Sequence, residues 1–264
     1  MGNKKKRFLF IIIVVLMMIP LGVQAHHGWT FAGFQLHWPR LNNMLTFEAR
    51  NYLTGDWPKY FGVAVKDWNS SKSLNVRAIP GGAVGDCLPN SNCMHMFNGN
   101  YGANGWLGLA TVGGYFVDHE GDGVFDQIHL NVGATYMNDY YFDSQPFYNT
   151  PVWRQVVMCQ EMGHIFGLGH NDENFDNPST GTCMDYSNDP SPNQHPNAHD
   201  FDTLAEIYNH ADSDTIRRAT NVPASPPSQA AWGSVVHQQG NNAVYAAQNG
   251  DQITFTFVTF VGAE

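Results

Sequence analysis

The stretch that decides the fold runs from residue 160 to residue 170 and reads Gln160-Glu161-Met162-Gly163-His164-Ile165-Phe166-Gly167-Leu168-Gly169-His170. On an α-helix, residues four apart lie on one face, so the side chains at positions 160 and 164 converge on a single point. Gly167 can adopt a positive φ and end the helix, which lets His170 return to that point from another direction. The stretch therefore predicts three side chains around one centre.

The spacing is that of the zinc-binding pattern H-E-x-x-H-x-x-G-x-x-H, with glutamine in place of the first histidine. Three protein ligands and a fourth position open to water form a catalytic zinc site. Zinc lowers the pKa of its bound water towards ~7 and polarises a carbonyl. Gln160, His164 and His170 are the predicted Zn²⁺ ligands, and Glu161 is the predicted general base that accepts the proton of the water.

The residues before the motif predict the helix that carries it. Thr150 is an N-cap, and Pro151 occupies the first helical position. Apolar residues at helical spacing follow at Val152, Trp153, Val156 and Val157. A helix over about residues 150–167 is expected, with Cys159 about 140° round it from His164 and its sulfur pointing away from the ligands.

A second motif, Cys183-Met184-Asp185-Tyr186, lies downstream. With both motifs the chain resembles the metzincin zinc metallopeptidases, and among them the secreted bacterial matrixin-like peptidases, over about residues 40–212. The resemblance implies a methionine turn beneath the metal, formed by Met184. It also implies that Tyr186 acts as a further zinc ligand or stabilises the oxyanion.

The fold class implied by the resemblance is α/β (α+β). A mixed twisted sheet would carry the active-site helix, the methionine turn and a C-terminal helix, with a small β appendage after them. One strand would form the edge of the cleft, where an extended substrate peptide pairs by β-augmentation. The implied activity is that of a zinc-dependent endopeptidase acting on a protein or peptide substrate.

Two positions depart from the family pattern. Residue 160 is glutamine, whose amide oxygen reaches about as far as a histidine Nε2 but is a poorer zinc ligand. Asn171, just after the third ligand, matches none of the best-known branch markers. Cys159 and Tyr186 are the two residues that could replace the missing ligand, and Tyr186 is the better of them. The alternative function is a catalytically silent scaffold that binds peptides or a surface partner through the same cleft.

The amino terminus predicts export. Four basic residues, Lys4 to Arg7, precede an apolar run of 12 residues from Phe8 to Ile19, and Val23-Gln24-Ala25 offers a small-residue cleavage site. Residues 1–25 are thus a predicted signal peptide, because a membrane span needs ~20 apolar residues. The predicted location is secreted and extracellular, with no stable membrane span after cleavage.

Charge excludes some partners. Cleavage removes four of the 13 basic residues and none of the 23 acidic ones, which leaves nine against 23, a net charge of −14. A chain with this much negative charge is not expected to bind nucleic acid or anionic membranes. A monomer is also expected. Cleavage would also place His26 and His27 at the amino terminus, where an unstructured role is favoured over a copper-binding oxidative enzyme using His26.

Four cysteines in an exported chain predict two disulfides, with three connectivities open. Cys87 and Cys93 would close a small loop. The resemblance places the methionine turn below the active-site helix, which implies that Cys159 pairs with Cys183. Such a bond would contribute roughly 3 kcal/mol by loop-closure reasoning.

An acidic stretch, residues 118–126, gives a partial match to a calcium loop. Oxygen ligands at alternate positions and a glycine at the sixth resemble the opening of an EF-hand, and the candidate Ca²⁺ ligands are Asp118, Glu120, Asp122 and Asp126. Against this, His129 stands where the bidentate twelfth ligand belongs. The alternative is a tight acidic turn between two strands, because Asp-Gly is itself a hairpin signal.

The rest of the chain predicts three parts: a peptidase domain over residues 26–212, a Pro-rich linker over 213–228 and a small β-rich appendage over 229–264. The appendage reads as three strands with a type I′ turn at Asn249-Gly250, and it is too short to form a core alone. It would pack on the peptidase domain, pair with another chain or bind a surface. Strands are expected at Leu45–Tyr52, Leu74–Ile79, Met94–Phe97, Leu107–Val112, Val124–Val132, Trp232–Gln238, Ala243–Gln248 and Gln252–Phe260, and further helices at Thr54–Trp68 and about 198–212.

Overall fold

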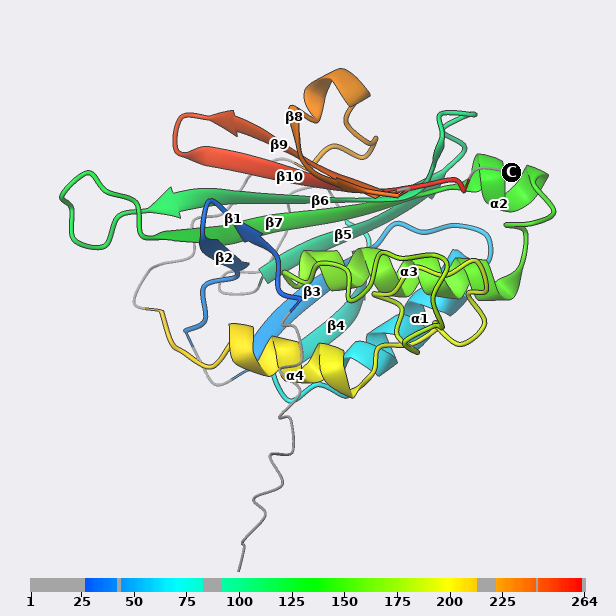
Figure 1. The fold of residues 1–264 in the computed structure, drawn as a ribbon, viewed down its shortest axis with the longest axis horizontal. Coiled ribbons are helices and arrows are strands. Elements are labelled where there is room, and N and C mark those ends of the chain that lie inside the picture. The colour runs from blue at the N-terminus through cyan, green and yellow to red at the C-terminus, as the bar shows by residue number, and fades with distance from the viewer. Residues whose placement is uncertain (1–26, 42–43, 83–91, 213–221, 241, 263–264) are drawn as a thin grey trace, which may run out of the picture.

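The computed structural model describes residues 27–41, 44–82, 92–212, 222–240 and 242–262. Within these residues a ten-stranded sheet is joined by four α-helices, so the fold is mixed α/β (Figure 1). The strands are β1 (Thr30–Phe31), β2 (Phe34–His37), β3 (Leu45–Asn51), β4 (Leu74–Pro80), β5 (Asn92–Gly99), β6 (Trp106–Val117), β7 (Gln127–Asn138), β8 (Ser234–Gln239), β9 (Asn242–Asn249) and β10 (Gln252–Phe260). The helices are α1 (Trp57–Trp68), α2 (Asp139–Ser144), α3 (Pro151–Ile165) and α4 (Ala198–Ile207), and a 3₁₀ turn spans Gln229–Ala231.

The sheet has a parallel part and an antiparallel part. Its strand order is β4-β3-β5-β7-β6-β10-β9-β8, and β2 pairs with β7 off this path. Strands β4, β3, β5 and β7 run parallel to one another, whereas β6 is antiparallel to β7, and β10, β9 and β8 continue to alternate in direction. Helices α1, α3 and α4 gather on one side of the sheet (Figure 1).

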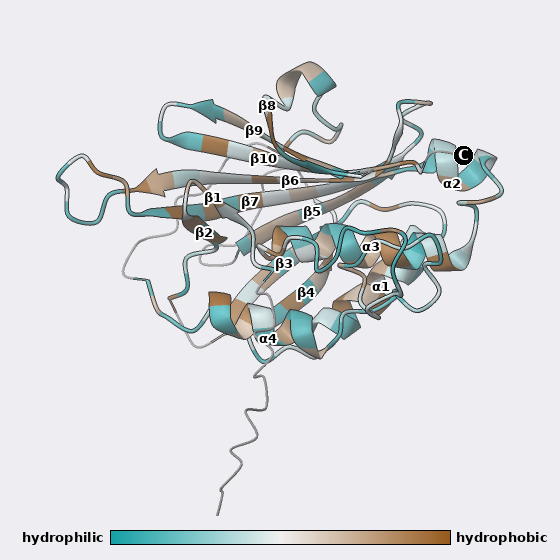
Figure 2. Ribbon diagram, viewed as in Figure 1, coloured by the Kyte–Doolittle hydropathy of each residue, from teal (hydrophilic) through white to brown (hydrophobic). Residues whose placement is uncertain are grey.

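Helix α1 buries one face against α3. Its buried residues recur at helical spacing, and Trp68 at its end donates from Nε1 to the backbone oxygen of Cys159 at 3.1 Å. Both helices carry hydrophilic and hydrophobic segments, as expected of helices that cover one side of a sheet (Figure 2). The helix begins at Trp57, three residues later than the sequence predicts, because Pro58 occupies its first turn.

Helix α3 begins and ends as the sequence predicts, within two residues. The Thr150 side chain accepts a hydrogen bond from Trp153 N at 3.2 Å, and Pro151 follows it. Gly167 has a φ of +90°, and a Cβ there would lie 2.7 Å from the backbone oxygen of Leu36. Only glycine satisfies both conditions, so the chain turns sharply here and brings His170 back.

Helix α4 has the capping box expected of Asn197 and Asp200. It is shorter than predicted, because Tyr208 leaves the helical conformation with a φ of −107° and a ψ of +33°. The chain after α4 runs back toward β2, where Asp212 N donates to the backbone oxygen of Arg40 at 2.9 Å.

The C-terminal strands continue the main sheet. Strand β10 pairs antiparallel with β6, with Phe257 opposite Ala110, and β9 and β8 follow in order. Of the three placements that the sequence leaves open for this appendage, the structure has it packed on the rest of the chain.

The predicted type I′ turn at Asn249-Gly250 is wrong. Asn249 is still in β9, and the two-residue loop is Gly250-Asp251. Gly250 has a φ of +64°, whereas Asp251 does not have a positive φ. A positive φ at the first loop residue alone is typical of a type II′ turn.

Several expectations fall outside the described residues: the signal peptide over residues 1–25, His26, Cys87 of the Cys87–Cys93 pair, and residues 213–221 of the linker. None of the helices in the described part of the chain has the length and apolar character of a membrane span.

Candidate metal centre

Two histidines face each other at the end of α3. His164 lies in the last turn of the helix, and His170 follows the turn at Gly167. Their Nε2 atoms are 3.1 Å apart, and their rings are nearly perpendicular at 89°. Two nitrogen ligands on a tetrahedral zinc ion, each at about 2.0–2.1 Å, lie about 3.3 Å from each other. The spacing therefore fits a shared metal ion.

The hydrogen bonds of the two rings fix which nitrogen carries the proton. His164 Nδ1 lies 2.9 Å from the backbone oxygen of Leu168, and His170 Nδ1 lies 2.8 Å from Glu173 Oε1. Because both acceptors lack a proton, each Nδ1 is the donor, and each Nε2 is left with its lone pair. Two lone pairs 3.1 Å apart repel each other, and a cation between them would remove this repulsion.

Burial keeps both rings neutral. It lowers the pKa of His164 well below the ordinary value, with repulsion from His170 adding to the effect. Burial also lowers the pKa of His170, although the Glu173 carboxylate opposes the shift. Metal binding requires neutral imidazole, so the two rings hold the required form without losing a proton.

Glu173 is a site residue that the sequence motif does not include. Its carboxylate lies 2.8 Å from His170 Nδ1 and 2.8 Å from His237 Nε2 on β8. Although burial opposes ionisation, these hydrogen bonds hold the pKa of Glu173 below its usual value. A carboxylate behind a metal-binding histidine orients the ring and raises its basicity. The only signal in the sequence is an acid three residues after the last histidine.

Tyr186 joins the histidine pair. Its hydroxyl lies 2.9 Å from His170 Nε2, and its ring stacks on Phe175 with 5.2 Å between centroids. Burial, followed by the charge of Glu161, raises the pKa of Tyr186 well above its ordinary value. The phenol therefore stays protonated and can donate a hydrogen bond.

Gln160 and Glu161 are buried beneath β10. Gln160 is 1% exposed and Glu161 is fully buried. The hydroxyl of Thr259 lies 3.0 Å from Gln160 Oε1 and 2.9 Å from Glu161 Oε1. Glu161 Oε2 is buried and has no hydrogen-bond partner among the described residues. One carboxylate oxygen is thus left to bind a water or an ion.

Burial also sets the proton affinity of Glu161. It raises the pKa of this carboxyl to about 8, and the hydrogen bond from Thr259 opposes the shift only in part. A cation beside the carboxylate would lower that pKa again, because opposite charge favours the ionised form.

Strand β10 covers the centre along the edge of β6. The ring of Phe257 stacks on His164 with 4.5 Å between centroids and 11° between planes. Because β10 pairs with β6 residue for residue from Gln252 to Thr259, it lies where an extended peptide would add to that strand. The sequence motif does not reveal this contact, which joins residues about 95 positions apart in the chain.

Residues 183–186, the predicted methionine turn, pack directly beneath α3. A Cβ on Gly163 would lie 2.3 Å from Met184 Sδ, so the sulfur touches the helix backbone. A disulfide joins Cys159 on the helix to Cys183, with 5.9 Å between their Cα atoms. Cys159 therefore points away from the histidines, as its helical position predicts.

An apolar pocket opens beside the centre. It is lined by residues of α3, by Tyr148 before it and by β6 and β10, and it reaches Gln160 and Tyr186. Trp153 and Val156 on α3 give it an apolar wall.

The acidic stretch forms the loop between β6 and β7. The Asp118 carboxylate accepts from Gly121 N at 2.7 Å and from Gly123 N at 2.8 Å, and Asp126 contacts His119 Nδ1 at 2.7 Å. The His119 hydrogen bond lowers the pKa of Asp126. These carboxylates hold the loop itself, as a tight acidic turn does, and calcium binding at Asp118, Glu120, Asp122 and Asp126 stays a prediction.

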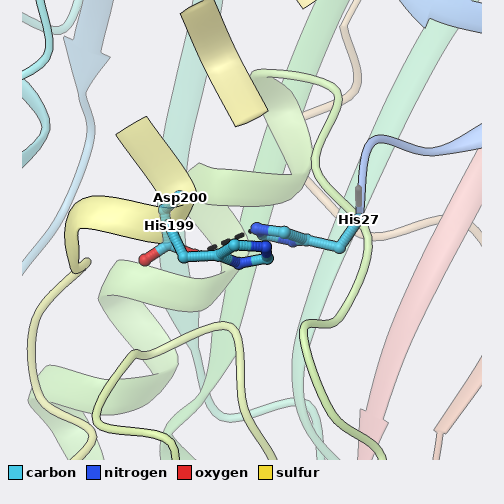
Figure 3. Close-up of side chains that lie close together, drawn as sticks. All are labelled: His27, His199 and Asp200. Atoms are coloured by element: carbon cyan, nitrogen blue, oxygen red, sulfur yellow. Dashed lines mark ion pairs between the residues drawn. The ribbon is translucent and has the colours of Figure 1, made fainter. Parts of the chain in front are cut away.

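A further histidine cluster lies at the N-terminal end of α4 (Figure 3). His27 is 8% exposed, its Nε2 lies 3.3 Å from Asp200 Oδ1, and its ring stacks on His199 with 4.8 Å between centroids. Its Nδ1 is 3.1 Å from the backbone oxygen of Gly169, next to His170. The expectation of an unstructured terminus is therefore wrong for His27.

No family model matches this chain, and no curated protein matches it.

Proposed function

We propose that this protein is a zinc-dependent endopeptidase of the metzincin type, with His164 and His170 as metal ligands and Glu161 as the general base. One observation supports it most strongly: the two Nε2 lone pairs face each other at 3.1 Å, while both Nδ1 atoms are engaged elsewhere. The ion would polarise the scissile carbonyl and lower the pKa of a bound water.

The surrounding residues have distinct roles in this proposal. Glu161 takes the proton of the attacking water through Oε2, the oxygen without a partner among the described residues, and passes it to the leaving amine. Tyr186 donates its phenol hydrogen to the developing oxyanion. Glu173 positions His170 by holding its Nδ1–H.

Gln160 is the third ligand in this proposal. Its Oε1 accepts from Thr259 in the structure, so the second lone pair of that oxygen has to face the metal. A peptide also has to replace β10 at the edge of β6 before it can reach Glu161. We infer that β10 holds the cleft closed and that cleavage follows its displacement.

The covered cleft also favours a second candidate function. Because Thr259 and Phe257 seal Gln160, Glu161 and His164 from solvent, the same scaffold would be catalytically silent if β10 never left. In that case a peptide or a surface partner would bind through the same cleft, in the apolar pocket beside the centre, without being cleaved.

A cleavage assay separates the two functions. The mature chain, loaded with zinc, is incubated with a mixture of unstructured peptides, and new termini are detected by mass spectrometry. We expect cleavage that a chelator stops and zinc restores, and that Glu161→Gln reduces at least ~10²-fold. Glu206→Gln, an exposed acid on α4, is the matched control and should cleave as the parent does.

The same assay includes Phe257→Ala, which removes the ring that stacks on His164. The proposal expects this variant to cleave faster than the parent, because β10 loses a contact with the centre. If neither the parent nor Phe257→Ala shows zinc-dependent cleavage, the silent scaffold is the better account.

A further inference from the structure

A third group of histidines surrounds one carboxylate past the C-terminal end of α4. His37 ends β2, His129 lies in β7, and His210 and Asp212 follow α4. The three Nε2 atoms lie 3.5, 3.4 and 3.4 Å from the same atom, Asp212 Oδ1. Hydrogen bonds between N–H and oxygen are shorter, about 2.9–3.0 Å. The four side chains thus converge on one point, but the distances between them are longer than those of ordinary hydrogen bonds.

The other atoms of the cluster are held by the backbone. His37 Nδ1 lies 3.0 Å from the backbone oxygen of Gln35, so Nδ1 is a donor and Nε2 is the atom that faces Asp212. That Nε2 is buried and has no hydrogen-bond partner among the residues that the structure describes. Asp212 Oδ2 accepts from Arg40 N at 2.7 Å, which leaves Oδ1 to the histidines.

The arrangement of the rings surrounds a point. His37 lies 4.8 Å from both His129 and His210, at interplanar angles of 79° and 77°. The side chains of His37, His129 and Asp212 are 4%, 0% and 2% exposed, whereas His210 is 39% exposed and borders an open pocket. Three buried ligands and one at the surface leave a path by which an ion can enter.

One charged neighbour of the cluster is Arg40. Its guanidinium donates to the backbone oxygens of Tyr208 and His210. The carboxylate of Asp212 is the anionic group that a cation would bind at this point.

We propose that His37, His210 and Asp212 bind a divalent transition metal, with His129 as the fourth ligand. Three imidazoles and one carboxylate are a ligand set that Zn²⁺ takes in proteins, and four protein ligands are typical of a structural site. His129 joins the set when its Nε2, now 2.6 Å from Gln127 Oε1, turns toward the metal. The ion would tie β2 and β7 to the segment after α4.

The site is independent of the proposed peptidase centre. None of its residues belongs to the motif at residues 160–170, and it joins different elements of the fold. A chain without any peptidase activity would still bind metal here. A metal-free network of histidines around Asp212 is the competing explanation of the same geometry.

The test uses zinc uptake by the whole mature chain. The variant His164→Ala/His170→Ala removes the other proposed centre, and the metal-free protein is titrated with Zn²⁺ by calorimetry. We expect one zinc per chain, and a loss of affinity of at least about tenfold when His37→Ala is added. His195→Ala, which changes an exposed histidine paired with Asp67, is the matched control and should leave uptake unchanged.

A second variant and a second measurement support the interpretation of the zinc titration. Asp212→Asn has nearly the same shape as the parent and replaces His37→Ala if that variant does not fold. In the background variant, zinc should raise the midpoint of thermal unfolding, and the rise should vanish with Asp212→Asn. Failure of the background variant to take up zinc, or uptake that neither substitution weakens, would overturn the proposal.

Discussion

At the scale of single residues, the strongest feature is the proton arrangement of His164 and His170. His164 donates its Nδ1–H to Leu168 O, and His170 donates its Nδ1–H to Glu173. The Nε2 atom of each ring faces the other ring. Neutral imidazoles that face each other in this way are unfavourable by themselves. They become favourable when a cation binds between them, which is why the pair is a better indication of metal than the sequence spacing alone.

The raised pKa of Glu161 predicts a pH dependence of stability in the metal-free protein. Burial raises it from 4.5 to about 8, so the folded protein keeps a proton that the unfolded chain releases. This contribution is fully present below pH 4.5 and is lost as the pH rises to about 8. Chemical unfolding should show stability falling by up to about 1.4 kcal/mol per pH unit in that window.

The glutamine of Glu161→Gln cannot ionise. The free energy of unfolding of this variant should therefore fall less with pH than that of the parent. The difference between the two proteins isolates Glu161, because the histidines titrate in both. Equal slopes for the parent and the variant between pH 4.5 and about 8 would show that the carboxyl is ionised in the folded state.

At the scale of elements, α3 and residues 183–186, the predicted methionine turn, act as one unit. Met184 Sδ occupies the space that a side chain at Gly163 would need, and the Cys159–Cys183 disulfide joins the same two segments. The helix therefore cannot move relative to the turn without disturbing the base of the candidate metal centre.

This contact predicts the effect of Gly163→Ala. The added methyl group would lie 2.3 Å from Met184 Sδ, so the helix or the turn has to shift. We expect a loss of about 1–3 kcal/mol in the free energy of unfolding, as for other overpacked cores. Met184→Ala makes room for the methyl group, so the double variant should lose less than the sum of the two single losses. Additive losses would show that the two residues are not in contact.

Strand β10 gives a prediction about access to the cleft. Thr111 on β6 and Thr256 on β10 are directly opposite each other, and both line a pocket on the sheet face away from Phe257. Opposed residues of antiparallel strands have Cα atoms about 4.5–5.5 Å apart, within the range of a disulfide. Thr111→Cys/Thr256→Cys, once oxidised, should hold β10 on β6 and abolish zinc-dependent cleavage.

A reductant should restore the activity of this locked variant. The single variant Thr256→Cys and the parent, treated with the same oxidant and reductant, control for effects on the native disulfide. If the oxidised double variant cleaves peptides as fast as Thr256→Cys does, β10 need not leave its place, and the cleft must open in another way.

At the scale of the whole molecule, the sequence predicts local structure better than arrangement. Strong periodicity places β3, α1, β4 and α3 within three residues of their observed bounds, and β10 at its observed bounds. Elements without such a pattern are missed: β1 and β2 are short, and α2 is only six residues long. The bounds of β6 and β7 are misjudged, because their glycines interrupt the alternation of apolar residues.

The residues of the site divide in the same way. His164, His170, Glu161 and Tyr186 have fixed spacings along the chain, so a motif can identify them. Thr259, Phe257 and His237 reach the centre only because β10 and β8 extend the sheet. No spacing rule relates strands so far apart in sequence, and the same holds for the histidines around Asp212.

The central claim is that a zinc ion lies between His164 and His170. The most direct measurement is anomalous X-ray diffraction at the zinc edge from crystals of the mature chain grown with zinc. We predict a peak about 2.0–2.1 Å from the Nε2 atoms of both residues. A map with no peak there, from crystals in which zinc is bound elsewhere in the molecule, would contradict the claim.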